Sequence, residues 1–194
     1  LLAVALLFAA CTSKVQISAE NIADLVSVSL PQSSEAVTAK WTLDGKYFWL
    51  ERYNSVALYD SKTLQKVASY AAGEDQVLYD VSPDGNLIAL ASSDSTLVLY
   101  DVIKQQEVKR IPQAAFISQA LFSPDGTLLG TANANAWEIT LWNTNSAQAI
   151  KTLTGFETAA PVYSFQFGSD GKTILWIARG TLQPMNIESA TLGP

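Results

Sequence analysis

The stretch VLYDVSPDGNLIALASSDSTLVLYD, residues 77–101, decides the fold class. Two apolar runs, at residues 87–91 and 96–100, follow the Asp-Gly pair at Asp84 and Gly85. Glycine accepts a positive φ without steric cost, so this pair favours a tight hairpin turn. Short β-rich runs bounded by turn signals are typical of antiparallel sheet and not of helix. The stretch therefore predicts several strands of one small antiparallel sheet.

This arrangement recurs four times along the chain. Asp-Gly pairs begin at residues 44, 84, 125 and 170, which are 40, 41 and 45 residues apart. A second mark follows each pair by 15 to 17 residues, at Tyr59-Asp60, Tyr100-Asp101, Trp142-Asn143 and Met185-Asn186. Four-stranded sheets that repeat about every 40 residues are the blades of a β-propeller. The predicted fold is therefore an all-β propeller with about four blades.

Hydrophobicity is graded across the strands of each copy. The second and third runs are nearly continuous and apolar, which predicts strands covered on both faces. In the first three copies a fourth, more polar run carries the basic residues Lys66, Lys109, Arg110 and Lys151. Lysine on an edge strand disfavours pairing with a strand of another chain, so this run is predicted to be the outermost strand of its sheet. The fourth copy has no such run.

Composition excludes several classes of site. The 194 residues include one cysteine and no histidine. An internal disulfide, a Ser-His-Asp or Cys-His catalytic arrangement and a histidine-ligated metal are therefore ruled out. The net charge of −6 disfavours a nucleic-acid partner. We expect no catalytic residues, no metal and no cofactor.

The first eleven residues predict a processing signal. LLAVALLFAA, residues 1–10, is an apolar run too short to span a membrane as a helix, and it suits the core of a secretory signal peptide. The end of this run together with the next residue, Phe8-Ala9-Ala10-Cys11, resembles the lipobox of bacterial lipoproteins, with Phe8 in place of the usual aliphatic residue. The resemblance implies lipid attachment at Cys11 and an extracytoplasmic location in the bacterial cell envelope. Without an initiator Met or a basic region, the chain is expected to be clipped at its start.

From about residue 21 to residue 194 the chain resembles the WD-repeat family. LYD and LWN stand where that family has Trp-Asp, and SPDG matches its first hairpin. The lead-in at residues 17–25 is similar to that of bacterial envelope WD-repeat proteins. The resemblance implies a protein-binding scaffold and usually seven blades, with an N-terminal strand closing the ring, for which residues 25–30 are suited. With no histidine, the family's Asp-His-Ser/Thr-Trp hydrogen-bond network cannot form. Because about four blades are present instead of seven, we expect an incomplete ring in a truncated chain; a four-bladed ring closed by residues 25–30 is the alternative.

These observations divide the chain into a signal-peptide core at 1–10, a lipid-anchored tether at 11–24 and a propeller at 25–194. The blades are predicted near residues 36–70, 76–111, 116–153 and 161–187. Loops between second and third strands cluster at one end of a propeller and differ among the copies, so we expect that end to bind a protein partner. The candidate partner-binding residues are Tyr53, Asn54, Asp94, Asn133, Asn135, Trp137 and Arg179.

Two other functions stay open. The propeller could be a module of a larger envelope enzyme whose catalytic domain lies beyond residue 194. Alternatively, it could bind a small ligand in its central channel, which first-strand residues would line: Lys40, Tyr79, Gln119 and Ser164. The leading hypothesis is a scaffold that is held at the membrane through its lipid anchor alone and has no catalytic activity.

Overall fold

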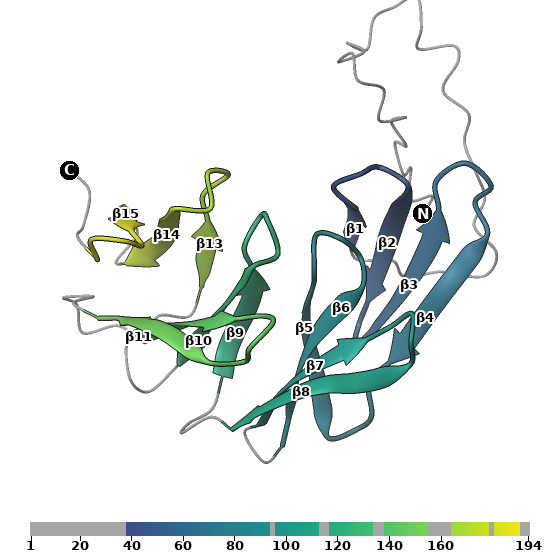
Figure 1. The fold of residues 1–194 in the computed structure, drawn as a ribbon, viewed down its shortest axis with the longest axis horizontal. Coiled ribbons are helices and arrows are strands. Elements are labelled where there is room, and N and C mark those ends of the chain that lie inside the picture. Colours follow the sequence, from purple (N-terminus) through teal and green to yellow (C-terminus); the bar gives the residue numbers. More distant parts are fainter. Residues whose placement is uncertain are drawn as a thin grey trace, which may run out of the picture. The chain divides into compact units, whose positions relative to one another are not determined.

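The computed structural model describes residues 38–93, 96–112, 117–133, 138–154, 164–178 and 181–190. All regular elements in these ranges are β-strands, which form four antiparallel sheets (Figure 1). The predicted fold class, an all-β propeller with about four blades, is confirmed. No helix in the described ranges is long and apolar enough to cross a membrane. The predicted signal peptide, Cys11, the tether and the strand at 25–30 lie outside the described residues.

The chain divides into two compact units, residues 1–71 and 72–194. The first unit holds one sheet, blade 1, with its strands in sequence order. They are β1 (Thr38–Trp41), β2 (Tyr47–Arg52), β3 (Ser55–Asp60) and β4 (Lys66–Ala71). On one face of this sheet, Phe48, Leu50 and Tyr59 form a buried apolar cluster. The rings of Phe48 and Tyr59 stack there with their centroids 5.5 Å apart.

The second unit holds three sheets. Blade 2 consists of β5 (Gln76–Val81), β6 (Leu87–Ser92), β7 (Thr96–Asp101) and β8 (Gln106–Pro112). Blade 3 consists of β9 (Ile117–Phe122), β10 (Leu128–Asn133), β11 (Glu138–Asn143) and β12 (Ala149–Leu153). Blade 4 has three strands in the described residues, β13 (Phe165–Phe167), β14 (Thr173–Ala178) and β15 (Thr181–Asn186). The predicted polar fourth strands are β4, β8 and β12, and each lies at a sheet edge.

Blades of the second unit stack through two apolar cores. The core between blades 2 and 3 contains Leu97, Leu99 and Ile111 from one sheet and Phe122 and Leu129 from the other. The core between blades 3 and 4 joins the sheets in the same way, and its buried members include Ile139, Leu141, Leu153, Phe165, Ile174, Trp176 and Met185. The first strands of the three blades, β5, β9 and β13, are neighbours. Face-to-face stacking through the middle strands is what the apolar runs predicted.

The Asp-Gly pairs form one type of turn in all four blades. In each, the glycine has positive φ, from 64° to 77°, and its N–H bonds to the carbonyl three residues earlier. In blade 3, the Ser123 hydroxyl donates to Asp125 at 2.6 Å and accepts the N–H of Leu128 at 2.9 Å. Thr42 and Ser82 bond in the same way in blades 1 and 2. These bonds satisfy the turn's donors locally.

Blade 4 reaches the same turn without the hydroxyl. Gly168 stands where the other blades have serine or threonine. There Asp170 accepts the backbone N–H of Thr173 directly, at 3.1 Å, together with that of Lys172 at 2.9 Å. The aspartate thus replaces the hydroxyl as the acceptor.

Hydrogen bonds lower the pKa values of three turn carboxylates, Asp44, Asp125 and Asp170. The backbone N–H of Lys46, followed by its ammonium and the Thr42 hydroxyl, lowers the pKa of Asp44 from 3.8 to about 2. Similarly, the Ser123 hydroxyl and the backbone of Thr127 lower the pKa of Asp125. A carboxyl whose pKa is lower in the folded than in the unfolded chain contributes stability above the unfolded pKa. That contribution is lost as the pH falls through the folded pKa.

We therefore expect the free energy of unfolding to decrease as the pH falls from about 4 to about 2. Urea unfolding at a series of pH values measures this decrease. Asp44→Asn should make the decrease shallower, because the substituted side chain does not titrate. An identical acid slope in the wild type and the variant would contradict the assignment.

A second turn follows each third strand. Asp60 Oδ1 accepts the backbone N–H groups of Lys62 and Thr63, and Asn143 Oδ1 accepts those of Asn145 and Ser146. Four residues after each of these acceptors the chain takes positive φ at a residue other than glycine, namely Leu64, Gln105, Ala147 and Ala190. The register between third and fourth strands also shifts at one equivalent place, before Tyr59, Tyr100 and Trp142. The second repeated motif, such as Tyr59-Asp60, therefore begins a turn, and in blades 1 to 3 the strand after this turn contains a bulge.

Candidate functional site

The β2–β3 hairpin of blade 1 carries two of the predicted partner-binding residues. Arg52 pairs with Ser55, so Tyr53 and Asn54 are the whole turn. Asn54 has φ of 54°, which asparagine tolerates better than most residues. Tyr53 is 95% exposed. A rigid turn thus presents a large aromatic side chain to solvent.

Of the other predicted residues, Asn133 alone is described. It ends β10, pairs with Glu138 and is half-buried. Asp94, Asn135, Trp137 and Arg179 lie outside the described residues.

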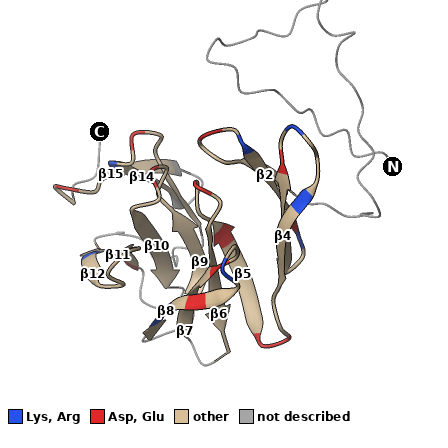
Figure 2. Cartoon of the chain, turned by 45° about the vertical axis from the view of Figure 1, so that its right-hand side comes forward, with Lys and Arg blue, Asp and Glu red and all other residues tan. Residues whose placement is uncertain are grey.

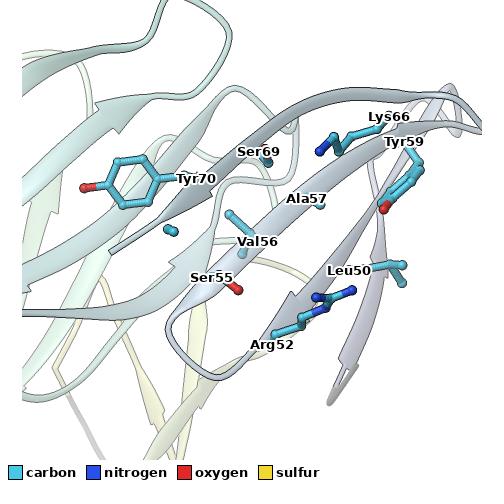
Figure 3. Close-up of a pocket in the computed structure, with 10 residues that line it drawn as sticks. Leu50, Arg52, Ser55, Val56, Ala57, Tyr59, Lys66, Ser69 and Tyr70 are labelled. Carbon is cyan, nitrogen blue, oxygen red and sulfur yellow. The ribbon is translucent and has the colours of Figure 1, made fainter. Parts of the chain in front are cut away.

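Next to the Tyr53-Asn54 turn lies a groove that the sequence analysis did not find (Figure 3). Its volume is about 360 Å³, and it runs along β3 and β4. The register places Leu50, Ala57 and Ser69 side by side on one face. Arg52 and Lys66 line the groove from β2 and β4, on the two sides of β3. We call this feature the blade-1 groove.

The blade-1 groove is basic in an acidic protein. Arg52 and Lys66 are exposed, and within the described part of the chain neither forms an ion pair. Figure 2 shows one basic segment on β4, whose single basic residue is Lys66. Leu50 and Tyr59, on the floor between the two cations, are buried. The chemistry suits an acidic ligand with an apolar side chain between its charges.

A second, polar crevice lies in the second unit. Its volume is about 260 Å³, and it is lined by Asn133, Glu138 and three threonines that pair across β10, β11 and β12, namely Thr131, Thr140 and Thr152. Trp142 Nε1 donates to Thr131 Oγ1 at 2.9 Å in its wall. The complete Asp-His-Ser/Thr-Trp network was expected not to form without histidine, but its Trp–Thr bond alone is present in blade 3.

First-strand residues named for the small-ligand alternative make structural contacts. The Tyr79 hydroxyl donates to the carbonyl of Ile117 at 2.6 Å, and burial raises the pKa of Tyr79. Gln119 Oε1 accepts the N–H of Phe165 at 2.7 Å. These two bonds join blade 2 to blade 3 and blade 3 to blade 4. Lys40 forms an ion pair with Glu51 at 3.1 Å, and Ser164 is exposed.

Within the described ranges no group of three or more Cys, Asp or Glu side chains could hold a metal ion. The turn aspartates are instead bonded to the backbone, as in the Asp44 and Asp125 turns. The lowered pKa values of Asp44 and Asp125 follow from those structural bonds.

Comparisons with known proteins agree with the architecture. The family described as "WD domain, G-beta repeat" matches residues 64–101. Protein tipD of Dictyostelium discoideum is 32% identical over 177 residues, which cover 84% of this chain and 26% of that protein. The chain thus spans about a quarter of the length of this curated relative. In fold it is similar to Kuenenia stuttgartiensis hydrazine synthase, with a TM-score of 0.60, 19% identity and coverage of 87% of this chain and 51% of that one.

Proposed function

We propose that this chain is a scaffold that binds a protein partner and catalyses no reaction. Its blades and its family match are those of a WD-repeat β-propeller. The observation that carries the proposal is Tyr53, which is 95% exposed on a two-residue turn between paired strands. Exposed tyrosine on a rigid support is a frequent anchor of protein interfaces, because little conformational entropy is lost on binding. WD-type repeats suit protein–protein interaction in general.

We also propose where the scaffold acts. Cys11 follows a short apolar run and a small-residue site, so the protein would be lipid-anchored in a bacterial envelope and face away from the cytoplasm. The intact mass of protein recovered from a membrane fraction tests this proposal. We expect acyl chains on Cys11, and Cys11→Ser should move the protein to the soluble fraction. An unmodified Cys11 in the native protein would refute the anchor.

The partner surface is tested by combined substitution of Tyr53, Asp94, Trp137 and Arg179 with alanine. We expect the variant to lose at least about ten-fold in retention of the partner, which corresponds to about 1.4 kcal/mol. The measurement is quantitative pull-down from envelope extract followed by affinity determination with the purified partner.

A matched control carries alanine at four exposed residues on or directly after the turns that follow the third strands, Lys62, Gln65, Gln106 and Glu188. This control should retain the partner as the wild type does. Unchanged binding by the Tyr53-containing variant would refute the proposed surface.

A further inference from the structure

We propose that residues 20–24, with the sequence ENIAD, bind in the blade-1 groove of their own chain. The inference does not depend on the scaffold function and concerns how the segment before the propeller is held.

The spacing of the groove's charges defines what fits it. Arg52 lies opposite Ser55, and Lys66 lies opposite Tyr59, in the register of β3 with its neighbours. The two cations are therefore four residues apart along β3, about 13 Å at ~3.3 Å per residue, and two strands apart across the sheet, about 10 Å at ~4.8 Å per strand. A segment that contacts both crosses β3 obliquely. The apolar floor at Leu50 and Ala57 lies between them. An extended segment with carboxylates at positions i and i+4 and an apolar side chain at i+2 matches this pattern, because all three point to one side.

The chain contains one segment with that pattern. Of its 18 acidic residues, two pairs are four residues apart, Glu20 with Asp24 and Asp80 with Asp84. Serine is central in the second pair, whose aspartates lie in β5 and its turn. Ile22 is central in the first pair. Its side chain would cover Leu50 and Ala57 while Glu20 and Asp24 approach the two cations.

Charge and chain length permit this contact. The chain has 12 basic residues against 18 acidic ones, so an acidic segment is repelled by most of the surface and attracted to this basic groove. Thirteen residues, 25–37, connect Asp24 to Thr38, where β1 begins, so the connection has fourteen residue-to-residue steps. Fully extended, they reach up to about 46 Å, so the connection does not limit access. The bound segment would lie beside the Tyr53-Asn54 turn.

Disulfide trapping in the full chain tests the proposal. Ile22→Cys and Ser69→Cys are combined with Cys11→Ser, because Ser69 lies beside Ala57 on the groove face. Under mild oxidation we expect an intramolecular cross-link, seen as a faster-migrating monomer on a non-reducing gel. Ala23→Cys, in place of Ile22→Cys, is the matched control, because its side chain points away in an extended segment and should be trapped less.

Charge variants decide whether the ion pairs position the segment. Glu20→Lys with Asp24→Lys should slow trapping about five-fold or more, as expected for two exposed ion pairs. Adding Arg52→Glu and Lys66→Glu should restore it, whereas Lys62→Gln, outside the groove, should change nothing. Failure of the reversed charges to restore trapping, equal trapping at positions 22 and 23, or a cross-linked dimer would overturn the proposal. The dimer would instead assign the groove to a second copy.

Discussion

Replacing Phe165 with alanine is expected to lower the free energy of unfolding by about 3–5 kcal/mol. Phe165 is 1% exposed and belongs to the core between blades 3 and 4. Its ring lies so close over Gly130 that a Cβ built on this glycine would be 2.8 Å from it. Removal of the ring leaves a cavity between two sheets whose backbones are fixed by strand pairing. Urea unfolding followed by tryptophan fluorescence measures the loss.

Phe167 is the matched control, since it lies on the same strand and is half-buried. Phe167→Ala should cost clearly less than Phe165→Ala. Gly130→Ala tests the contact from the other side, and it should destabilise the wild type more than it destabilises a Phe165→Leu background. A loss below about 1 kcal/mol for Phe165→Ala would contradict the predicted cavity cost.

The second large effect is expected at Asp80. This side chain is 7% exposed, and its Oδ2 accepts the N–H of Phe122 from blade 3 at 2.8 Å. Asp80→Ala leaves that buried N–H without its acceptor, which costs about 1–3 kcal/mol. Asp80→Asn can keep an oxygen acceptor and should recover most of the loss. Chemical unfolding of both variants checks the difference, and equal destabilisation would show that the hydrogen bond is not the cause.

Local features of the fold could be predicted from the sequence. The Asp-Gly turns and the apolar runs at 87–91 and 96–100 depend on chemistry within a few residues, and the structure confirms them as turns and strands. Blade 4 was predicted near residues 161–187, and within the described residues its first strand begins at Phe165. There the N–H of Phe165 bonds to Gln119 of the preceding blade. Contacts with the preceding blade are not encoded in the local pattern.

Most features of the candidate sites depend on such distant contacts. The exposure of the Tyr53-Asn54 turn could be inferred from its place between two strands. The blade-1 groove could not, because Arg52 and Lys66 come to one face of the sheet only through the register of three strands. Asp80 likewise accepts a hydrogen bond from a residue 42 positions away. The left-handed residues such as Leu64 were missed for another reason. A positive φ is usually inferred from glycine, and these positions have none.

The bulge in the outermost strands of blades 1 to 3 has a consequence for solubility. It recurs opposite Leu58/Tyr59, Leu99/Tyr100 and Leu141/Trp142 of the third strands. A bulge bends its strand and increases the local twist. A straight strand from a neighbouring molecule would therefore meet a curved edge along β4, β8 or β12 and could form only part of a ladder. Where many copies are crowded together, this irregularity would help to keep them from polymerising edge to edge.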